Sequence, residues 1–422
     1  MHIATLDLLR CPYCGGRLEL VASIFHRSDA SHIQDGILGC HCCVFPVVDG
    51  IPVLHLQPSA IAARGHVEAG QPALALRAMI GLDDEACAAR FQLVADSETA
   101  TYRDIVLALG DNFEGGYFLY RFSDPTYVVA DAVVRAVARA VMDGRRALDM
   151  CGGSGHLTRS LLDVSTGAPV LADLYFVKVW LARRFTAPGC EPVCCDANSP
   201  LPFARGAFGF AMCADAFQYI WTKRQLVGEM IRAVDDGDVD CDGHGGGTGA
   251  VVINHTRNSL VWSPSQGQPL PPAGYRELFE TLEPRLFSGS GLFADVVARG
   301  VVDLSRRDTT QALDADPGLT IVWTRHPGVF ESHMVDHPRA LRGTFRINPL
   351  YETTRAGGRL HLRLRFPSKD YEDEYGACRQ YLPEETTVDA AALEALESGD
   401  RPQALEELIR RRVIVDLPTY YY

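Results

Sequence analysis

Long hydrophobic runs are missing from the sequence: no stretch of about 18 uncharged apolar residues occurs in its 422 positions. The first residues, "MHIATLDLLRCPYC", also lack the basic region and the long apolar region of a signal peptide. We therefore expect a cytoplasmic protein with no membrane partner. With 47% apolar residues, the chain can form hydrophobic cores, and its length is sufficient for two or three domains.

Positive charge is scarce as well. Lys and Arg total 40 against 53 Asp and Glu, which gives a formal charge of −13. Nucleic acid is therefore a disfavoured partner. The 13 cysteines are an odd number in a chain with no export signal, so free thiols and metal ligands are favoured over disulfides. A glycine-rich run with five aspartates, residues 235–249, predicts a solvated loop.

A glycine-rich stretch, "RRALDMCGGSGHLTRSLLD" (145–163), predicts an apolar strand, a turn of small residues and a helix. It lacks the Lys-Ser/Thr pair of a P-loop and the G-x-G-x-x-G dinucleotide fingerprint. Asp149 at the strand end would repel a pyrophosphate, so a cationic ligand is favoured. A turn that only reverses the chain is the competing interpretation.

Asp149, Gly153 and Gly155 resemble the first motif of class I S-adenosylmethionine-dependent methyltransferases, with Cys151 in place of the first glycine and Gly152 as an extra one. Two further apolar runs end at Asp173 and Asp196. The resemblance implies that the glycines approach the amino-acid end of S-adenosylmethionine, Asp173 its ribose and Asp196 its adenine. Cofactor residues implied by the resemblance are Asp149, Cys151, Gly153, Gly155, Asp173, Leu174, Asp196, Ala197 and Arg121.

The alternation of strands and helices predicts an α/β, doubly wound, Rossmann-like sheet. We expect a zinc-ribbon domain at 1–57, a helical linker or lid at 58–110, a methyltransferase domain at 111–328 with an insertion at 256–300, and a small α+β domain at 338–422. The period-two pattern of "RLHLRLRF" (359–366) predicts a strand in the last domain, paired with "TFRINPLYE" (344–352) as a hairpin.

Two C-x2-C pairs, Cys11/Cys14 and Cys40/Cys43, predict a tetrahedral structural zinc site. The surrounding sequence resembles the small zinc-ribbon family that activates methyltransferases. Cys43 is preferred as the fourth ligand, and Cys42 is the alternative.

Methyl transfer needs mainly an aligned nucleophile, and a base where the acceptor is oxygen or nitrogen. His255, just past one predicted strand, is the first candidate base, ahead of Tyr219 and Asp215 past another. Trp262, Tyr275 and Phe279 of the insertion are expected to wall a substrate pocket.

The predicted function is methylation of a small molecule or peptide in bacterial specialised metabolism, with S-adenosylmethionine and structural Zn²⁺. The alternatives are an RNA methyltransferase and a catalytically silent scaffold that activates a partner enzyme; a homodimer is left open.

Overall fold

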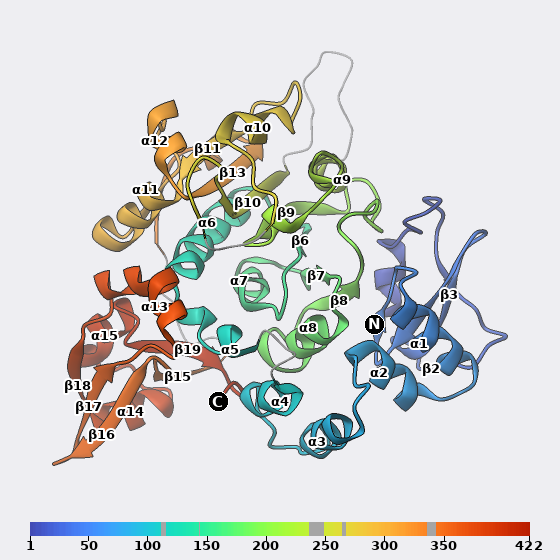
Figure 1. The fold of residues 1–422 in the computed structure, drawn as a ribbon, viewed down its shortest axis with the longest axis horizontal. Helices are drawn as coiled ribbons and strands as arrows, with labels where there is room; N and C mark the ends of the chain where they lie inside the picture. The colour runs from blue at the N-terminus through green and yellow to red at the C-terminus, as the bar shows by residue number, and fades with distance from the viewer. Residues whose placement is uncertain (111–114, 143, 236–248, 264–266, 336–342) are drawn as a thin grey trace.

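A seven-stranded sheet forms the centre of the computed structural model, which describes residues 1–110, 115–142, 144–235, 249–263, 267–335 and 343–422 (Figure 1). Its strands, in spatial order, are β11 (Arg285–Ser288), β13 (Gly318–Thr324), β10 (Ala250–Arg257), β9 (Phe208–Ala214), β6 (Arg146–Met150), β7 (Val170–Asp173) and β8 (Glu191–Cys194). Strands β8, β7, β6, β9 and β10 pair in parallel, whereas β13 is antiparallel to both neighbours. The chain reverses its winding between β6 and β9, which confirms the predicted doubly wound architecture.

The two faces of the sheet belong to two separate apolar cores. Along β6, Ala147 faces the core formed with the helices α6 (Pro125–Val141), α7 (His156–Val164) and α8 (Phe176–Leu181). The next residue, Leu148, faces the core formed with α9 (Lys223–Val234). This alternation is the period-two geometry of a strand buried on both sides.

The amino-terminal module covers one edge of this sheet. Its elements are η1 (Ile3–Asp7), β1 (Glu19–Leu20), β2 (Arg27–Ser28), β3 (Ile33–Gly39), β4 (Val44–Val48) and β5 (Ile51–Pro52). Val53 bridges Cys194 of β8, and the Leu54 N–H donates to the carbonyl of Cys194 at 2.7 Å. The otherwise open edge of β8 is thereby paired.

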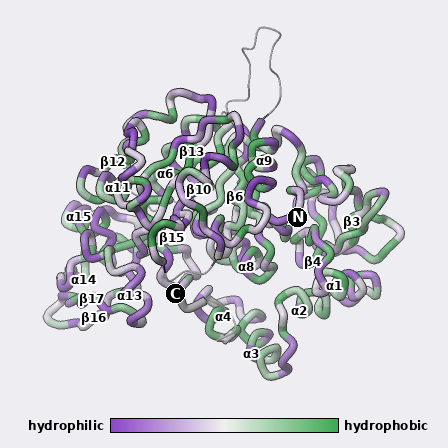
Figure 2. The backbone as a smooth tube through the Cα atoms, turned by 45° about the horizontal axis from the view of Figure 1, so that its top comes forward, coloured by the Kyte–Doolittle hydropathy of each residue, from purple (hydrophilic) through white to green (hydrophobic). Residues whose placement is uncertain are grey.

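Helices connect this module to the sheet, as the helical periodicity predicts. They are α1 (Pro58–Glu68), α2 (Pro72–Ile80), α3 (Glu85–Ala95), α4 (Tyr102–Leu109), α5 (Gly115–Phe118) and η3 (Arg121–Ser123). Asp84 caps α3, and Thr101 with Asp104 forms a capping box at the start of α4. No helix in the described ranges is long and apolar enough to cross a membrane. Hydrophobic and hydrophilic residues are interspersed along the chain (Figure 2).

The segments after β10 add short elements around β13. They are α10 (Pro272–Glu277), α11 (Gly289–Ala294), β12 (Val301–Asp303), α12 (Thr310–Ala315) and β14 (Ser332–Met334). The aspartate-rich loop expected at 235–249 lies, apart from its two ends, outside the described residues.

The last 80 residues form strands and helices, with one correction to the predicted pairing. The elements are β15 (Gly343–Ile347), β16 (Tyr351–Ala356), β17 (Arg359–Leu364), α13 (Lys369–Tyr375), β18 (Glu385–Asp389), α14 (Ala390–Glu397), α15 (Glu406–Arg410) and β19 (Ile414–Pro418). The hairpin around the Gly357-Gly358 turn joins β16 to β17, whereas β15 pairs with β19. Positive φ angles at both glycines permit this tight turn, which sets the register. The domain boundaries given above stay predictions.

Candidate functional site

A cavity of about 740 Å³ opens over the carboxyl ends of β6, β7, β8 and β9. This is the place where doubly wound sheets bind ligands. Its lining residues come from the glycine loop, from the ends of β7 to β10, from α5 and η3, and from α13: Asp149, Cys151, Gly152, Gly153, His156, Leu157, Asp173, Leu174, Tyr175, Lys178, Asp196, Ala197, Asn198, Ala214, Asp215, Ala216, Gln218, Tyr219, Ile220, Trp221, Arg257, Tyr117, Phe118, Arg121, Glu374 and Tyr375.

Asp149 lies at the floor of the cavity and is almost fully buried. Its Oδ2 accepts a hydrogen bond from the Thr158 hydroxyl at 2.6 Å, whereas its Oδ1 has no partner among the described residues. Burial, with a contribution from the charge of Asp173, raises the pKa of Asp149 to about 7, although the Thr158 hydrogen bond opposes the shift. A ligand with a hydrogen-bond donor or a positive charge would satisfy this carboxylate.

The glycine loop has its unusual backbone at three positions: Cys151, Gly153 and Gly155 have φ angles of 60°, 55° and 77°. Cys151 adopts a left-handed conformation that a glycine would adopt more easily. Gly152 is an extra glycine relative to the motif, yet a Cβ there would lie 2.5 Å from the Asp149 carboxyl carbon and 2.3 Å from the Leu171 side chain. Only glycine therefore fits beside Asp149 at this position.

Asp173 links the end of β7 to the glycine loop. Its Oδ2 accepts from the Gly153 N–H at 3.0 Å, and its Oδ1 accepts from the Tyr175 N–H at 2.9 Å. Burial raises the pKa of Asp173, and the positive charge of Lys178 opposes that shift. Each carboxylate oxygen keeps a lone pair for a ligand hydroxyl.

The third predicted acidic residue, Asp196, also lines the cavity. Its Oδ1 accepts from the backbone N–H and the side-chain amide of Asn198, at 2.8 and 3.2 Å. Leu174 and Ala197 lie beside these carboxylates in the cavity wall. The structure thus brings all nine predicted cofactor residues near one site, with Gly155 just behind the wall at the start of α7.

Arg121 lines the cavity but is already paired. Its Nη1 lies 2.9 Å from Asp124, and its Nη2 lies 3.1 Å from Asp215 Oδ2. It is 6% exposed, so it is not a solvated arginine. The neighbouring Tyr120 packs its ring against Tyr371 outside the cavity wall.

The predicted catalytic residues separate into two groups. Asp215 and Tyr219 line the cavity, whereas His255 does not. Asp215 and His255 follow directly after the paired residues of β9 and β10, and both have left-handed backbones, with φ angles of 59° and 48°. The His255 Nε2 lies 3.7 Å from Asp215 Oδ1, although His255 itself does not line the cavity.

A register shift between β10 and β13 explains the position of His255. The shift lies between Ile253 and Thr256, and it turns the His255 ring toward β13, where a Cβ on Gly318 would meet the ring at 3.1 Å. Burial lowers the pKa of His255 to about 4, although the Asp215 charge opposes the shift. The imidazole is therefore neutral at pH 7 and stands behind Asp215.

Asp215 instead presents its carboxylate to the cavity. It accepts a hydrogen bond from the Tyr117 hydroxyl at 3.3 Å. Burial alone would raise its pKa, but the interactions with His255 and with the cationic side chains of Arg121 and Arg257 lower the pKa below the ordinary value. Asp215 is thus held ionised in the cavity wall.

The expectation that insertion aromatics wall the pocket is wrong. Tyr275 and Phe279 are buried in the core beneath α9, and the Tyr275 hydroxyl donates to the carbonyl of Arg257 at 2.7 Å. Trp262 is 84% exposed and lies outside the cavity wall.

The sequence reasoning missed the cavity wall formed by α13. Glu374 Oε1 pairs with Arg257 Nη2 at 2.6 Å, and the Tyr375 ring lies 5.7 Å from that of Tyr117. No local pattern around Glu374 signals this role, because its partner lies 117 residues earlier in the chain.

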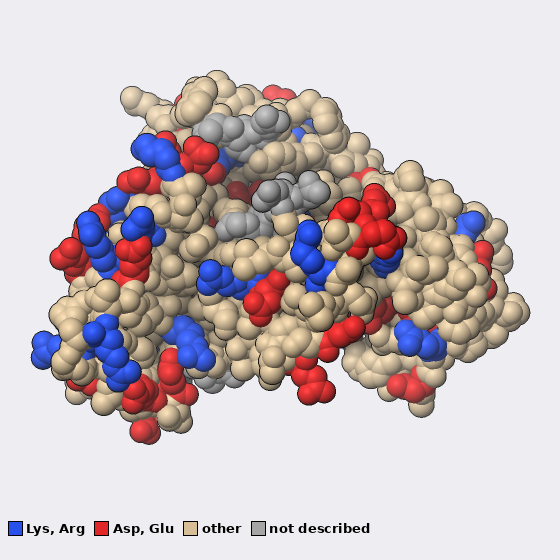
Figure 3. All heavy atoms as spheres, turned by 60° about the horizontal axis from the view of Figure 1, so that its bottom comes forward, with Lys and Arg blue, Asp and Glu red and all other residues tan. Residues whose placement is uncertain are grey.

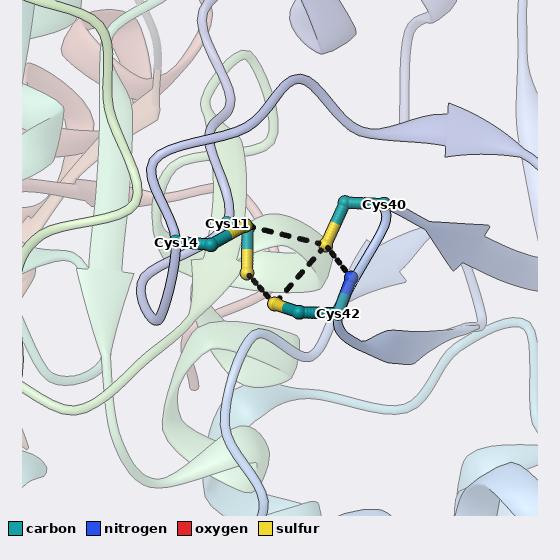
Figure 4. Close-up of side chains that lie close together, drawn as sticks. All are labelled: Cys11, Cys14, Cys40 and Cys42. Carbon is teal, nitrogen blue, oxygen red and sulfur yellow. Dashed lines mark hydrogen bonds between the residues drawn. The ribbon is translucent and has the colours of Figure 1, made fainter.

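A second site lies in the amino-terminal module, where Cys11, Cys14, Cys40 and Cys42 bring their sulfur atoms within 4.8 Å of one another (Figure 4). The Sγ atoms of Cys11 and Cys42 are 3.6 Å apart, and those of Cys14 and Cys40 are 3.7 Å apart. Zn–S bonds of about 2.3 Å give a tetrahedron with edges of about 3.8 Å, so the four thiols fit zinc.

The structure places Cys42 in this cluster instead of the preferred Cys43. Cys42 is exposed beside the other thiols, whereas Cys43 is half-buried and packs against the apolar core. The N–H groups of both residues point to Cys40 Sγ, at 3.4 and 3.3 Å. Burial alone would raise the pKa of Cys40, but these donors lower it to about 7, which favours a thiolate ligand.

No protein-family model and no curated protein match the sequence. Solved structures do match part of it. A putative methyltransferase from Bacillus halodurans is 15% identical and covers 45% of this chain and 96% of its own, with a TM-score of 0.30. The complex of a methyltransferase activator with a putative methyltransferase from Haloferax volcanii is 18% identical, covers 50% and 91%, and has a TM-score of 0.35. Geranyl diphosphate methyltransferase in complex with S-adenosylmethionine is 14% identical, covers 52% and 94%, and has a TM-score of 0.34.

Proposed function

We propose that this chain is an S-adenosylmethionine-dependent methyltransferase that acts on a small molecule or a peptide in bacterial specialised metabolism. One observation carries the proposal: a single cavity over the carboxyl ends of the parallel strands gathers the glycine loop, Asp149, Asp173 and Asp196. Carboxylates at successive strand ends suit a ligand with a positive charge and several hydroxyl and amino donors.

The residues present fit this cofactor, which would supply a methyl group on a positively charged sulfur. Asp149 has an unpartnered, buried Oδ1 that can accept from a ligand ammonium group. The absence of a side chain at Gly152 keeps the Asp149 carboxylate accessible. Asp173 would accept from ribose hydroxyls, and Asp196 with Ala197 would border the adenine.

The part of the cavity that we propose holds the methyl acceptor suits a small molecule or an extended peptide. Asp215 and Tyr219 face it from the end of β9, while Tyr117 and Tyr375 enclose it from two other segments. Ionised Asp215 can take a proton from an acceptor oxygen or nitrogen, and the Arg121 guanidinium, 3.1 Å away, holds the carboxylate in place. Together these side chains would align the acceptor molecule with the methyl group of the cofactor and exclude water from the cavity.

The charge distribution disfavours the RNA alternative. On the face shown in Figure 3, Lys and Arg are interspersed with Asp and Glu, and no continuous basic strip is visible. The net charge of −13 acts in the same direction.

The zinc cluster is proposed to have a structural role. Four thiols leave no open coordination position for a substrate, and the module that carries them pairs with the edge of β8.

Calorimetric titration with S-adenosylmethionine and S-adenosylhomocysteine tests the proposal. We expect wild type to bind both and Gly152→Ala to lose most of its affinity, because the new Cβ would collide with Asp149. Gly228→Ala is the control, since a Cβ at Gly228 of α9 meets nothing within 4 Å. Wild type that binds neither compound would favour the silent-scaffold alternative.

The acceptor can be sought by comparing metabolites and peptides of cells with and without the gene. The expected product differs from its precursor by the mass of one methylene group. Methylation found only on RNA would refute the proposed substrate class.

A further inference from the structure

Tyr421 lies close to the cavity although it is remote from it in sequence. The chain end containing Tyr420, Tyr421 and Tyr422 runs beside α4 and α5 (Figure 1). The Tyr421 side chain is fully buried, and its ring stacks on that of Tyr102 with centroids 4.8 Å apart. The buried hydroxyl must therefore find its partners within the protein.

Two residues of the cavity wall are those partners. The Tyr421 hydroxyl donates to the carbonyl oxygen of Phe118 at 2.6 Å and lies 2.7 Å from the His156 Nε2. Because the hydroxyl proton is donated to Phe118, the Tyr421 oxygen accepts from the Nε2–H of His156. Burial, together with the charge of Arg121, lowers the pKa of His156 to about 3, so the imidazole is neutral.

His156 and Phe118 both line the cavity beside the glycine loop. His156 is the first residue of α7, directly after Gly155. Phe118 ends the short helix α5 and stacks on the His156 ring at 5.7 Å, and a Cβ on Gly153 would lie 3.6 Å from the Phe118 ring. A four-residue helix such as α5 is not stable alone, so contacts with other segments must hold it over the loop.

We propose that Tyr421 is a positioning residue for the cofactor site. It acts through His156 and Phe118, whose separation it sets by bridging them with one hydroxyl. This inference rests on the proposed function. With α5 already held above the glycine loop, ligand binding does not have to order that segment, and affinity is higher.

Calorimetric titration of the full chain with S-adenosylhomocysteine tests the inference. Tyr421→Phe keeps the ring stack and removes both hydrogen bonds, and we expect its Kd to rise about 10-fold. Tyr422→Phe is the matched control, because its hydroxyl donates at 2.8 Å to the neighbouring Leu119 carbonyl, and Leu119 does not line the cavity. We expect the control to stay within about twofold of wild type.

A double-mutant cycle separates positioning from general packing. His156→Phe keeps an aromatic ring beside Phe118 but cannot donate to Tyr421. If Tyr421 acts through His156, the double variant should bind about as weakly as the weaker single variant, and the two effects should not add. Melting temperatures of all variants show whether the fold is retained.

Unchanged affinity in Tyr421→Phe, equal losses in Tyr421→Phe and Tyr422→Phe, or fully additive effects in the cycle would each overturn the inference while leaving the proposed function intact. Wild type that does not bind S-adenosylhomocysteine would instead overturn the proposed function, and this inference with it.

Discussion

The zinc cluster allows two adjacent cysteines to be compared directly. Cys42→Ser removes one of the four thiols that the structure places within 4.8 Å of one another, whereas Cys43→Ser changes a side chain packed against the apolar core. A four-ligand structural zinc site is worth about 10 to 16 kcal/mol, so one ligand accounts for about 3 kcal/mol, or about a 100-fold change in zinc affinity.

The assay is zinc content after dialysis against a series of chelator concentrations, with limited proteolysis of residues 1–57 as a second readout. We expect wild type and Cys43→Ser to retain about one zinc per chain and Cys42→Ser to lose it at about 100-fold lower chelator strength. Loss of zinc should also loosen the Leu54–Cys194 pairing at the edge of β8 and expose the module to protease. Retention in Cys42→Ser with loss in Cys43→Ser would refute the assignment.

Four further predictions concern three cavity residues and the neighbouring His255. Because the pKa of Asp149 is about 7, affinity for S-adenosylmethionine should rise from about pH 6 to about pH 8 as the carboxylate ionises, and calorimetry on Asp149→Asn should show this dependence abolished. Asp173→Ala should weaken cofactor binding by about 30- to 150-fold, because the carboxylate that accepts from two ribose hydroxyls and from the Gly153 N–H is lost. Affinity equal to that of wild type would show that Asp173 does not bind the ribose. Asp215→Asn should lower turnover by about 100-fold with cofactor affinity within a few fold, as measured in the methyl-transfer assay. The pKa of His255 is about 4 in the folded state and about 6.5 in the unfolded state, so its contribution to the free energy of unfolding is complete above pH 6.5 and is lost as the pH falls to 4. Over that interval, the free energy of unfolding of wild type should fall by up to about 3 kcal/mol relative to that of His255→Gln. Parallel plots of unfolding free energy against pH for the two proteins would contradict the burial of His255 as a neutral group.

Local chemistry makes several features readable from the sequence alone. The apolar strand, the small-residue turn and the acidic residue at its end are consecutive, so "ALDMCGGSG" indicates a ligand loop without knowledge of its partners. Asp173 and Asp196 end apolar runs, and parallel strands bring their carboxyl ends to one edge of a sheet. The Cys11/Cys14 pair is equally local, because two residues between thiols are enough to place both on one metal.

Only the tertiary structure decided which side chains face the cavity. His255 is expected just past a strand, but it lies within β10 (Ala250–Arg257), where a register shift against β13 places its ring beside Gly318. Tyr275 has the composition of a pocket wall, yet its hydroxyl is satisfied inside the core. Strand periodicity records which face is apolar, and it contains no information about a bulge imposed by a neighbouring strand.

The residues contributed from a distance were beyond sequence reasoning for the same physical reason. Glu374 meets Arg257 across 117 residues, and Tyr421 meets His156 across 265. Cys42 and Cys43 are adjacent and chemically identical, and only the folded chain shows that Cys42 lies with the other three thiols. Hydrophobic pattern and motif spacing determined the strand order of the site and its acidic residues. The contacts between distant segments, which form only when the cores pack, determined its walls, its positioning residues and the fourth thiol.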